Sequence, residues 1–112
     1  MNNAYEIPNL RFSLPAGEDV PRRRFVGVNA TGEGVLATTT AIGVSMNEAA
    51  AGEVLEVADG IVVVETSDAI EAGASISVAE GGLAVTAADG AVVGTALTGA
   101  TGANLFITVK IR

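Results

Sequence analysis

Four carboxylates follow one another closely in the middle of the chain, at Glu48, Glu53, Glu56 and Asp59. Carboxylate oxygens are the ligands that a hard cation such as calcium prefers, so a cluster of this kind could form a cation site. Their spacing does not fit the twelve-residue loop in which carboxylates at fixed positions surround calcium. We therefore interpret these residues as solvated side chains on strand faces and predict no metal site.

Nucleophilic catalysis has few candidate groups in this sequence. The chain has no Cys and no His, which removes the thiol nucleophile, the commonest zinc ligands and the usual general base. The candidate hydroxyls are those of Ser45, Ser67, Ser75 and Ser77. They could act only with a lysine as base, and Lys110 is the single lysine of the chain. A serine–lysine pair stays a formal alternative, and we predict a protein that is not an enzyme and has no cofactor.

Two glycine-containing segments superficially match cofactor motifs. Residues 32–37 match a dinucleotide fingerprint, but the threonines at 38–40 that follow do not open the helix which that motif requires. Residues 52–57 fit a lipoyl- or biotin-carrying domain. Such a domain needs a lysine at a central hairpin tip, and no lysine lies between Arg24 and Lys110.

Charge is divided unevenly along the chain. Thirteen acidic residues face six basic ones, and the formal net charge is −7. This balance argues against a nucleic-acid partner, because affinity for phosphate backbones comes mainly from clustered Lys and Arg. The exception is the run Arg22, Arg23 and Arg24, which could contact an acidic partner surface or lie in solvent before a strand.

Residues 1–24 differ from residues 25–112 because they contain all three prolines, Pro8, Pro15 and Pro21. Proline fixes φ and interrupts helices, so we expect an extended N-terminal arm followed by a β-rich domain. The apolar residues of the arm include Tyr5, Ile7, Leu10 and Phe12. They could rest on a partner or on the protein's own body, and the sequence leaves both possibilities open. Because the repeated strands all lie beyond the arm, we expect the arm to add little to the core.

From residue 25 onward, short runs of β-prone residues alternate with turns that contain glycine. The predicted strands cover residues 24–28, 35–38, 41–45, 54–57, 61–65, 75–79, 83–86, 92–97 and 105–111. The one helical candidate is residues 47–51, where alanines favour a single turn of helix before Gly52.

The strand pattern repeats at an offset of about 50 residues. The strand, glycine turn and strand of residues 28–38 resemble those of residues 78–86, and residues 42–46 resemble residues 93–97. Chance similarity in a sequence rich in Gly, Ala and Val is the alternative. We predict an all-β fold, a compact small barrel or sandwich built from a duplicated β-unit, with residues 61–65 between the halves.

Residues 90–109 form a stretch of 20 uncharged positions, long enough to cross a bilayer of about 30 Å. Four of them are Gly and four are Thr, a composition without the Leu and Ile density of a spanning helix. We therefore interpret this stretch as strand and turn, and expect no membrane partner. The first residues have neither the basic nor the apolar region of a secretory signal, so we expect synthesis in the cytoplasm.

Two segments carry a similarity to a known family. In the first, residues 42–44 follow a glycine-turn hairpin and lead through residues 48–54 to a hydrophobic strand. In the second, residues 93–97 precede an Ala/Gly loop and a closing strand of alternating aliphatic and basic residues at 107–112. This pattern resembles the small head decoration, or capsid cement, proteins of tailed bacteriophages. The resemblance covers residues 25–112 and leaves the proline-containing arm outside.

The resemblance implies a β-tulip-like domain that forms a homotrimer on the outer surface of a phage capsid and bridges subunits of the major capsid protein. It implies a virion protein that acts by contact, without nucleic acid, membrane or small-molecule substrate. Within this interpretation, we expect the arm to bind the capsid by adding as a strand to an exposed sheet edge. Its contact residues would be Tyr5, Ile7, Leu10, Phe12, Arg22, Arg23 and Arg24.

Two other function classes stay open. A non-enzymatic β-domain could recognise a carbohydrate or a protein at a cell or virion surface, and a carboxylate-dependent hydrolase would be an enzyme. Sugar-binding and glycosidase sites usually stack their substrate on aromatic faces, whereas this chain has no Trp, one Tyr and three Phe. This composition weakens both alternatives.

Overall fold

The computed structural model describes residues 6–88 and 90–112. Within these residues, nine strands account for almost all of the regular secondary structure, which confirms the predicted all-β fold. The strands are β1 (Ile7–Pro15), β2 (Phe25–Val28), β3 (Gly34–Leu36), β4 (Gly43–Ser45), β5 (Val54–Glu65), β6 (Ser75–Ala79), β7 (Leu83–Thr86), β8 (Gly94–Ala96) and β9 (Phe106–Ile111). A short 3₁₀-helix, η1 (Glu80–Gly82), connects β6 to β7.

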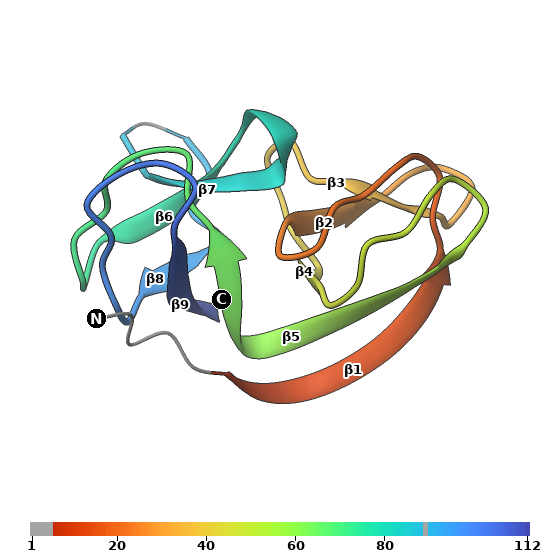
Figure 1. Cartoon of the computed structure of the whole chain (residues 1–112), viewed down its shortest axis with the longest axis horizontal. Coiled ribbons are helices and arrows are strands. Elements are labelled where there is room, and N and C mark those ends of the chain that lie inside the picture. Colours follow the sequence, from red (N-terminus) through yellow and green to blue (C-terminus); the bar gives the residue numbers. More distant parts are fainter. Residues whose placement is uncertain (1–5, 89) are drawn as a thin grey trace.

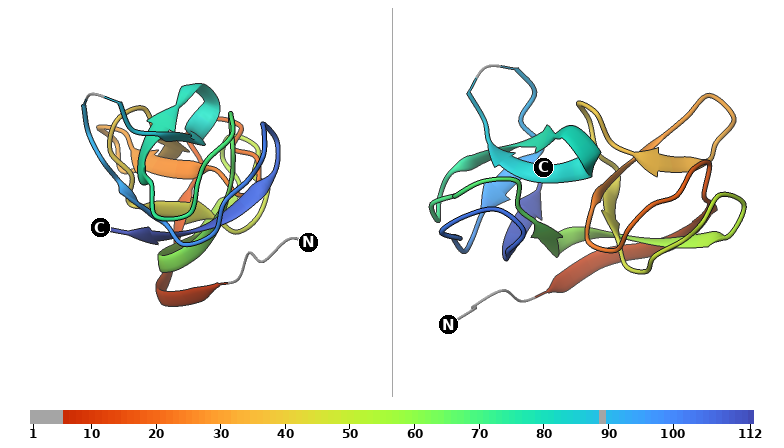
Figure 2. Two further views of the ribbon diagram at one scale, coloured as in Figure 1. Left: turned by 90° about the vertical axis from the view of Figure 1, so that its left-hand side faces the viewer. Right: turned by 45° about the horizontal axis from the view of Figure 1, so that its top comes forward.

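The strands form one curled antiparallel sheet in which the long β5 is shared by two lobes (Figure 1). The first lobe contains β1 to β4 and the N-terminal half of β5, and the second contains the C-terminal half of β5 and β6 to β9. Along one edge β5 pairs with β1, and along the other it pairs with β4 and then with β9. Figure 2 shows the lobes side by side, with the β1–β5 pair running beneath the first lobe.

The two lobes have the same strand connectivity, which confirms the predicted duplication. In the first lobe β2 pairs with β3 and β4, and β4 pairs with β5; in the second β6 pairs with β7 and β8, and β8 pairs with β9. Hydrogen bonds between loops repeat as well. Val20 and Ala49 exchange two backbone hydrogen bonds, of 2.8 and 3.0 Å, and Ile70 and Ala100 exchange two of 2.9 and 2.8 Å.

The structural repeat begins at β1, which lies outside the unit predicted from the sequence. Ala16, after β1, bridges Gly34 in the first lobe, and Thr66, after β5, bridges Ala84 in the second. β1 therefore corresponds to the C-terminal half of β5. The expectation that residues 61–65 separate the halves is wrong, because they are the first strand of the second half.

Each face of β5 serves a different lobe. Leu55 and Val57 are fully buried in the core of the first lobe, whereas Val62 and Val64 are fully buried in the core of the second. Successive side chains of a strand point to opposite faces, so odd-numbered residues fill one lobe and even-numbered residues the other. Val57 and Ala58 are buried consecutively, at the point where the buried face changes.

Phe25 lies where the two lobes meet. It is fully buried and, with Val44 and Ala58 of the first lobe, belongs to the core cluster of the second lobe. β2 pairs Phe25 with Val44, and β6 pairs Ser75 with Thr95 at the equivalent positions. Because Ser75 and Thr95 are exposed, the second lobe is polar where the first is apolar.

Two local predictions are wrong. Residues 54–57 and 61–65 form one strand, because Gly60, at a φ of 109°, lets the chain continue through the predicted turn. Residues 47–51 do not form a helical turn, because Ala49 bonds to the loop that precedes β2.

Residues 90–109 contain β8, most of β9 and the loop between them, in agreement with the predicted strand and turn. Across residues 6–88 and 90–112, no helix has both the length and the apolar character needed to span a membrane.

Candidate interaction surface

The N-terminal segment forms β1 and lies on the protein's own sheet. β1 pairs antiparallel with β5, so that Phe12 lies opposite Val57 and Leu14 lies opposite Leu55. Phe12 and Leu14 are half-buried and pack against the core of the first lobe. The segment is extended, as expected, but the expectation that it adds little to the core is wrong.

The apolar residues predicted as contacts differ in how far a partner could reach them. Tyr5 lies outside the described residues, and the backbone of Ile7 pairs with Ile61 on β5. Leu10 is 56% exposed, whereas Phe12 is half-buried against the protein's own core. Leu10 is therefore accessible to a partner.

β1 is an edge strand, and one side of its backbone faces outward. The Ala16 N–H donates to the carbonyl of Glu53 at 2.8 Å, so backbone groups at Ala16 face β5. Because these groups alternate in direction along a strand, those of Arg11 and Ser13 face away from β5. Pro15 shares the outward direction but has no N–H to donate, which limits strand addition at this end of the edge.

Two of the three arginines of the run are engaged within the protein. The Arg23 guanidinium lies 2.8 Å from the Glu6 carboxylate, and both side chains are largely buried. Arg24 donates from Nη1 to the Gly81 carbonyl at 3.0 Å, and its Nε lies 3.6 Å from the Glu65 carboxylate. Arg24 thereby connects the first lobe to η1 and to the end of β5.

Arg22 is the exposed member of the run. Its Nε donates to the Met46 carbonyl at 3.1 Å, which holds the side chain against the first lobe. Leu10 and Arg22 are thus the predicted contact residues that combine a described side chain with high exposure.

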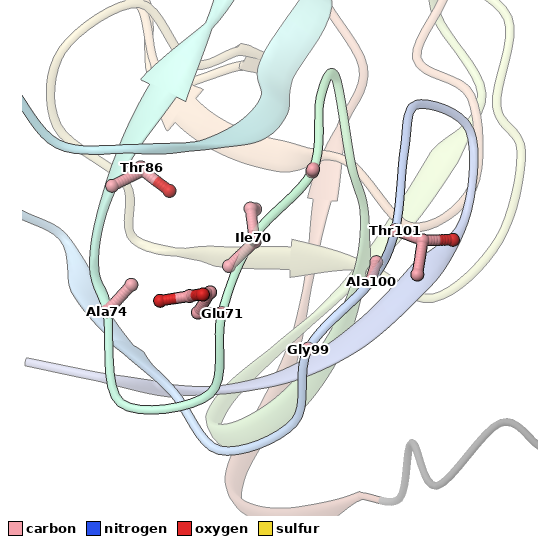
Figure 3. A pocket seen from close by; sticks show the side chains of 8 residues that line it. Ile70, Glu71, Ala74, Thr86, Gly99, Ala100 and Thr101 are labelled. Atoms are coloured by element: carbon pink, nitrogen blue, oxygen red, sulfur yellow. The ribbon is translucent and has the colours of Figure 1, made fainter.

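A cleft of about 580 Å³ opens in the second lobe (Figure 3). Its walls are formed by residues from segments 69–74 and 99–101, together with Thr86. Small and apolar side chains predominate, and Glu71 is the charged residue among those that line it. We refer to this feature as the large cleft.

The first lobe has a smaller cleft, of about 220 Å³, at the equivalent position. It is lined by residues 19–21, residues 48–50 and Glu53, around the bridge that corresponds to the one in the large cleft. Its lining contains three carboxylates, those of Asp19, Glu48 and Glu53. The two lobes therefore present the same cleft with different charge.

The comparisons with known proteins decide the family. The sequence profile of the phage cement proteins matches residues 6–111. The chain belongs to the phage cement protein family. The match includes β1, so the unit shared with the cement proteins is longer than residues 25–112, the range of the resemblance seen in the sequence. Among curated proteins no significant match is found.

One solved structure has the same fold as this cement family member. It is the crystal structure of the head fibre gp8.5 N base in bacteriophage phi29. The similarity has a TM-score of 0.78 and covers 92% of this chain and 93% of that one, at 20% sequence identity. At this level of identity, the likeness establishes the shared fold.

Three of the four serine hydroxyls considered as nucleophiles donate hydrogen bonds to the backbone. Ser45, Ser67 and Ser77 each donate from Oγ to a carbonyl oxygen. The acceptors are Pro21 at 2.6 Å, Ala84 at 3.2 Å and Ala91 at 2.6 Å. These hydroxyls stabilise loops of the sheet, in keeping with the structural role of the cement proteins.

Three of the four carboxylates of the central cluster are exposed, as expected, whereas Asp59 is half-buried. Glu48, Glu53 and Glu56 are exposed. Glu53 Oε1 accepts a hydrogen bond from the Ala50 N–H at 2.7 Å, which stabilises the turn before β5. In the part of the chain that the structure describes, no group of three or more acidic side chains is arranged to hold a metal ion.

The segment that resembled a dinucleotide motif, residues 32–37, contains the end of the turn between β2 and β3 and the whole of β3, so a strand stands where the motif requires a helix. Within this turn, Glu33 Oε1 accepts hydrogen bonds from Asn29 Nδ2 and Thr31 Oγ1, both at 3.0 Å. These bonds favour the ionised carboxylate, so they lower the pKa of Glu33 below the usual value of a glutamate.

One group of exposed residues was not predicted from the sequence. Leu97, Leu105 and Phe106 are 37%, 42% and 41% exposed, and all three lie within residues 90–109. The feature of the sequence that could have pointed to these exposed residues was the absence of charge in this stretch. It predicts strand and turn, but it does not say which apolar side chains stay on the surface.

Proposed function

We propose that the protein binds the outer surface of a phage capsid as a trimer and stabilises the shell by bridging neighbouring subunits of the major capsid protein. The observation that carries the proposal is the match of residues 6–111 to the phage cement proteins. A cement role requires a rigid body that contacts several capsid subunits, and it requires neither a nucleophile nor a metal. A single sheet with a continuous hydrogen-bond network suits that role.

The proposed attachment surface is the exposed part of the N-terminal segment. Leu10, Arg11 and Arg22 are exposed, and β1 offers outward-facing backbone groups at Arg11 and Ser13. An extended segment of a capsid subunit could pair with this edge, which would give backbone hydrogen bonds in addition to side-chain contacts. Tyr5 and Ile7 belong to the same segment.

Arg23 and Arg24 support this surface from within. The Arg23–Glu6 ion pair, at 2.8 Å, ties the start of β1 to the loop before β2. The contacts of Arg24 with Glu65 and η1 hold the two lobes together. We therefore assign these two arginines to positioning, and assign contact with the capsid to Arg11 and Arg22.

Charge gives attachment a preferred orientation. The chain carries a formal net charge of −7, while Arg11 and Arg22 both lie in the N-terminal segment. An acidic capsid surface would attract this segment and repel the rest of the body. Because salt screens exposed charges, attachment should weaken as ionic strength rises. In a trimer, three linked weak contacts would give an overall affinity about 10²- to 10⁴-fold higher than that of a single contact.

The experiment is co-sedimentation of the purified protein with empty expanded and unexpanded capsids of the phage that encodes it. The double variant Leu10→Glu with Arg22→Glu should bind about tenfold more weakly or worse, because it removes an apolar contact and reverses a charge. The matched control is Val28→Glu, which alters a side chain that is 47% exposed outside the N-terminal segment.

The outcomes distinguish the cement role of the protein from the location of its attachment surface. If the wild-type protein sediments with neither form of capsid, the cement role is wrong. If the double variant and the wild-type protein bind equally, the cement role stands and attachment belongs to another surface.

A further inference from the structure

The outer edge of β3 is closed by groups of the first lobe itself. β3 stands at one end of the strand order and β7 at the other, so each has an edge without a neighbouring strand. At the edge of β3, the Gly34 carbonyl accepts a hydrogen bond from the Gly17 N–H at 2.8 Å. The Leu36 N–H donates to Glu18 Oε2, also at 2.8 Å. An incoming strand therefore finds these backbone groups already bonded.

The equivalent edge of β7 is closed only in part. The Ser67 N–H donates to the Ala84 carbonyl at 2.9 Å, as the Gly17 N–H donates to Gly34. The next outward N–H of β7 is that of Thr86. Among residues 6–88 and 90–112, no hydrogen-bond acceptor is found for this N–H.

A shorter side chain accounts for the open N–H. Asp68 stands in the second lobe where Glu18 stands in the first, and its side chain has one methylene group fewer. Asp68 Oδ1 accepts from the N–H of Ala69 at 2.7 Å, so this carboxylate bonds within its own loop. Thr86 is exposed, and its N–H and carbonyl both face outward because the two groups of one residue point to the same side of a strand.

The cleft beside this edge is also wider than its counterpart. In the first lobe, Asp19 Oδ1 accepts from the Ala51 N–H at 3.1 Å, which connects one wall of the smaller cleft to the residue that follows the other wall. Ala69 takes the place of Asp19 in the second lobe and has no polar side chain. The large cleft measures about 580 Å³ against about 220 Å³, and Thr86 is one of the residues that line it (Figure 3).

We infer that the large cleft binds an extended segment of a partner protein that carries a lysine or an arginine. The backbone of this segment bonds to the N–H and the carbonyl of Thr86, as in the addition of a strand to a sheet edge. Ser67 limits the pairing on one side, so the side chains in the cleft supply the remaining contacts. This inference goes beyond the proposed function, which assigns capsid attachment to the N-terminal segment, and it does not depend on that assignment.

The charge of the cleft selects the partner. Glu71 is exposed and is the charged residue among those that line the cleft, and the chain has a net charge of −7. A carboxylate that approached the Thr86 N–H would be repelled, whereas a neutral backbone carbonyl is not and a basic side chain is attracted. Ile70 and Ala74 give the cleft an apolar wall, which suits the methylene groups of lysine or arginine.

Amide hydrogen exchange on the full chain tests whether the edge is open. The Thr86 amide should exchange at least about tenfold faster than the Leu36 amide, which is bonded to Glu18. Asp68→Glu restores the longer carboxylate and should slow exchange at Thr86, whereas Asp68→Ala should leave it fast. Equally slow exchange of the two amides in the wild-type protein would overturn the inference.

An NMR titration tests binding with a blocked pentapeptide, acetyl-Thr-Val-Lys-Val-Thr-amide, as the probe. At millimolar concentration the peptide should shift the amide resonance of Thr86. Asp68→Glu should weaken binding by about tenfold, because its carboxylate competes for the Thr86 N–H, and Asp68→Ala should bind as the wild-type protein does. Circular dichroism establishes that each variant is folded.

A second peptide, with norleucine in place of lysine, tests the choice of a basic partner. It should bind to the wild-type protein up to about fivefold more weakly, as expected for the loss of an exposed ion pair. Glu71→Gln should remove this difference between the peptides. The control Glu80→Gln, which neutralises an exposed carboxylate of the same lobe outside the lining of the cleft, should preserve it.

Two results of the titration would contradict the inference. If the lysine peptide leaves the Thr86 resonance unchanged, the cleft does not bind an extended segment. If the two peptides bind equally to the wild-type protein, or if Glu80→Gln removes their difference as fully as Glu71→Gln, Glu71 does not select a basic partner.

Discussion

Gly43 and Gly94 occupy equivalent positions in the two lobes and approach the neighbouring strand in the same way. A Cβ atom added to Gly43 would lie 2.5 Å from the carbonyl oxygen of Ala58, and one added to Gly94 would lie 2.5 Å from that of Lys110. Neither glycine has a positive φ. Close approach of two backbones, rather than an unusual conformation, therefore requires glycine at both positions.

Gly43→Ala and Gly94→Ala should each lower the free energy of unfolding by about 1–3 kcal/mol, because the added methyl group has no space beside a backbone carbonyl. Urea denaturation measures the change. The control is Gly102→Ala, since a Cβ atom there would meet nothing within 4 Å. We expect this control to be neutral or more stable by about 0.4–1 kcal/mol. A loss as large as that of Gly43→Ala would contradict the close-approach explanation.

Phe12→Ala should lower the free energy of unfolding by about 2 kcal/mol, less than for a fully buried phenylalanine. The reason is that Phe12 packs on the core of the first lobe. Leu10→Ala, in the same strand but 56% exposed, should change the free energy of unfolding by less than about 0.5 kcal/mol.

Deletion of residues 1–20 should unfold the first lobe, because it uncovers Leu55 and Val57. A deletion variant with unchanged denaturation would show that β1 is accessory.

Arg23→Gly should be more stable than Arg23→Ala by about 1 kcal/mol. Arg23 has a φ of 64°, and its counterpart Gly73 has a φ of 91°, so a residue with a Cβ atom is strained at this position. Both substitutions lose the ion pair with Glu6, and comparison of the two isolates the backbone contribution. Thermal and urea denaturation provide the measurement. Equal stability of the two variants would mean that the positive φ costs nothing here.

The carboxyl group of Glu33 should titrate below the usual pKa of a glutamate, with the change followed by NMR. Its folded pKa is lowered by hydrogen bonds from Asn29 and Thr31. The stabilisation is therefore fully present above the unfolded-state pKa and is lost as pH falls through the lower folded pKa. Asn29→Ala should raise the pKa of Glu33, and Thr31→Ala should raise it less. A titration midpoint of Glu33 at or above the usual pKa of a glutamate would show that the hydrogen bonds of this turn do not lower its pKa.

The positions of most strands could be predicted from the sequence because strand and turn preferences act over a few residues. Ser75–Ala79 and Leu83–Thr86 have the predicted bounds, since β-prone runs end at glycine turns on both sides. The duplication was also visible, as a repeat of the same short pattern. The family resemblance depended on that pattern, and it missed β1 because the sequence of β1 does not resemble that of its counterpart in β5.

The amino-acid sequence by itself determined an all-β chain with a repeated unit, an extended proline-containing start and no assembled set of catalytic residue types. The tertiary structure decided which segments meet. Whether β1 would lie on a partner or on its own body depended on the open edge of β5, whose paired residues follow those of β1 by 39 positions (Pro15 and Val54) to 54 positions (Ile7 and Ile61). The contacts of Arg24 with Glu65 and Gly81 were likewise decided by the fold. A sequence shows residue types and spacing, whereas burial and ion pairing depend on distances between segments that only the folded chain brings together.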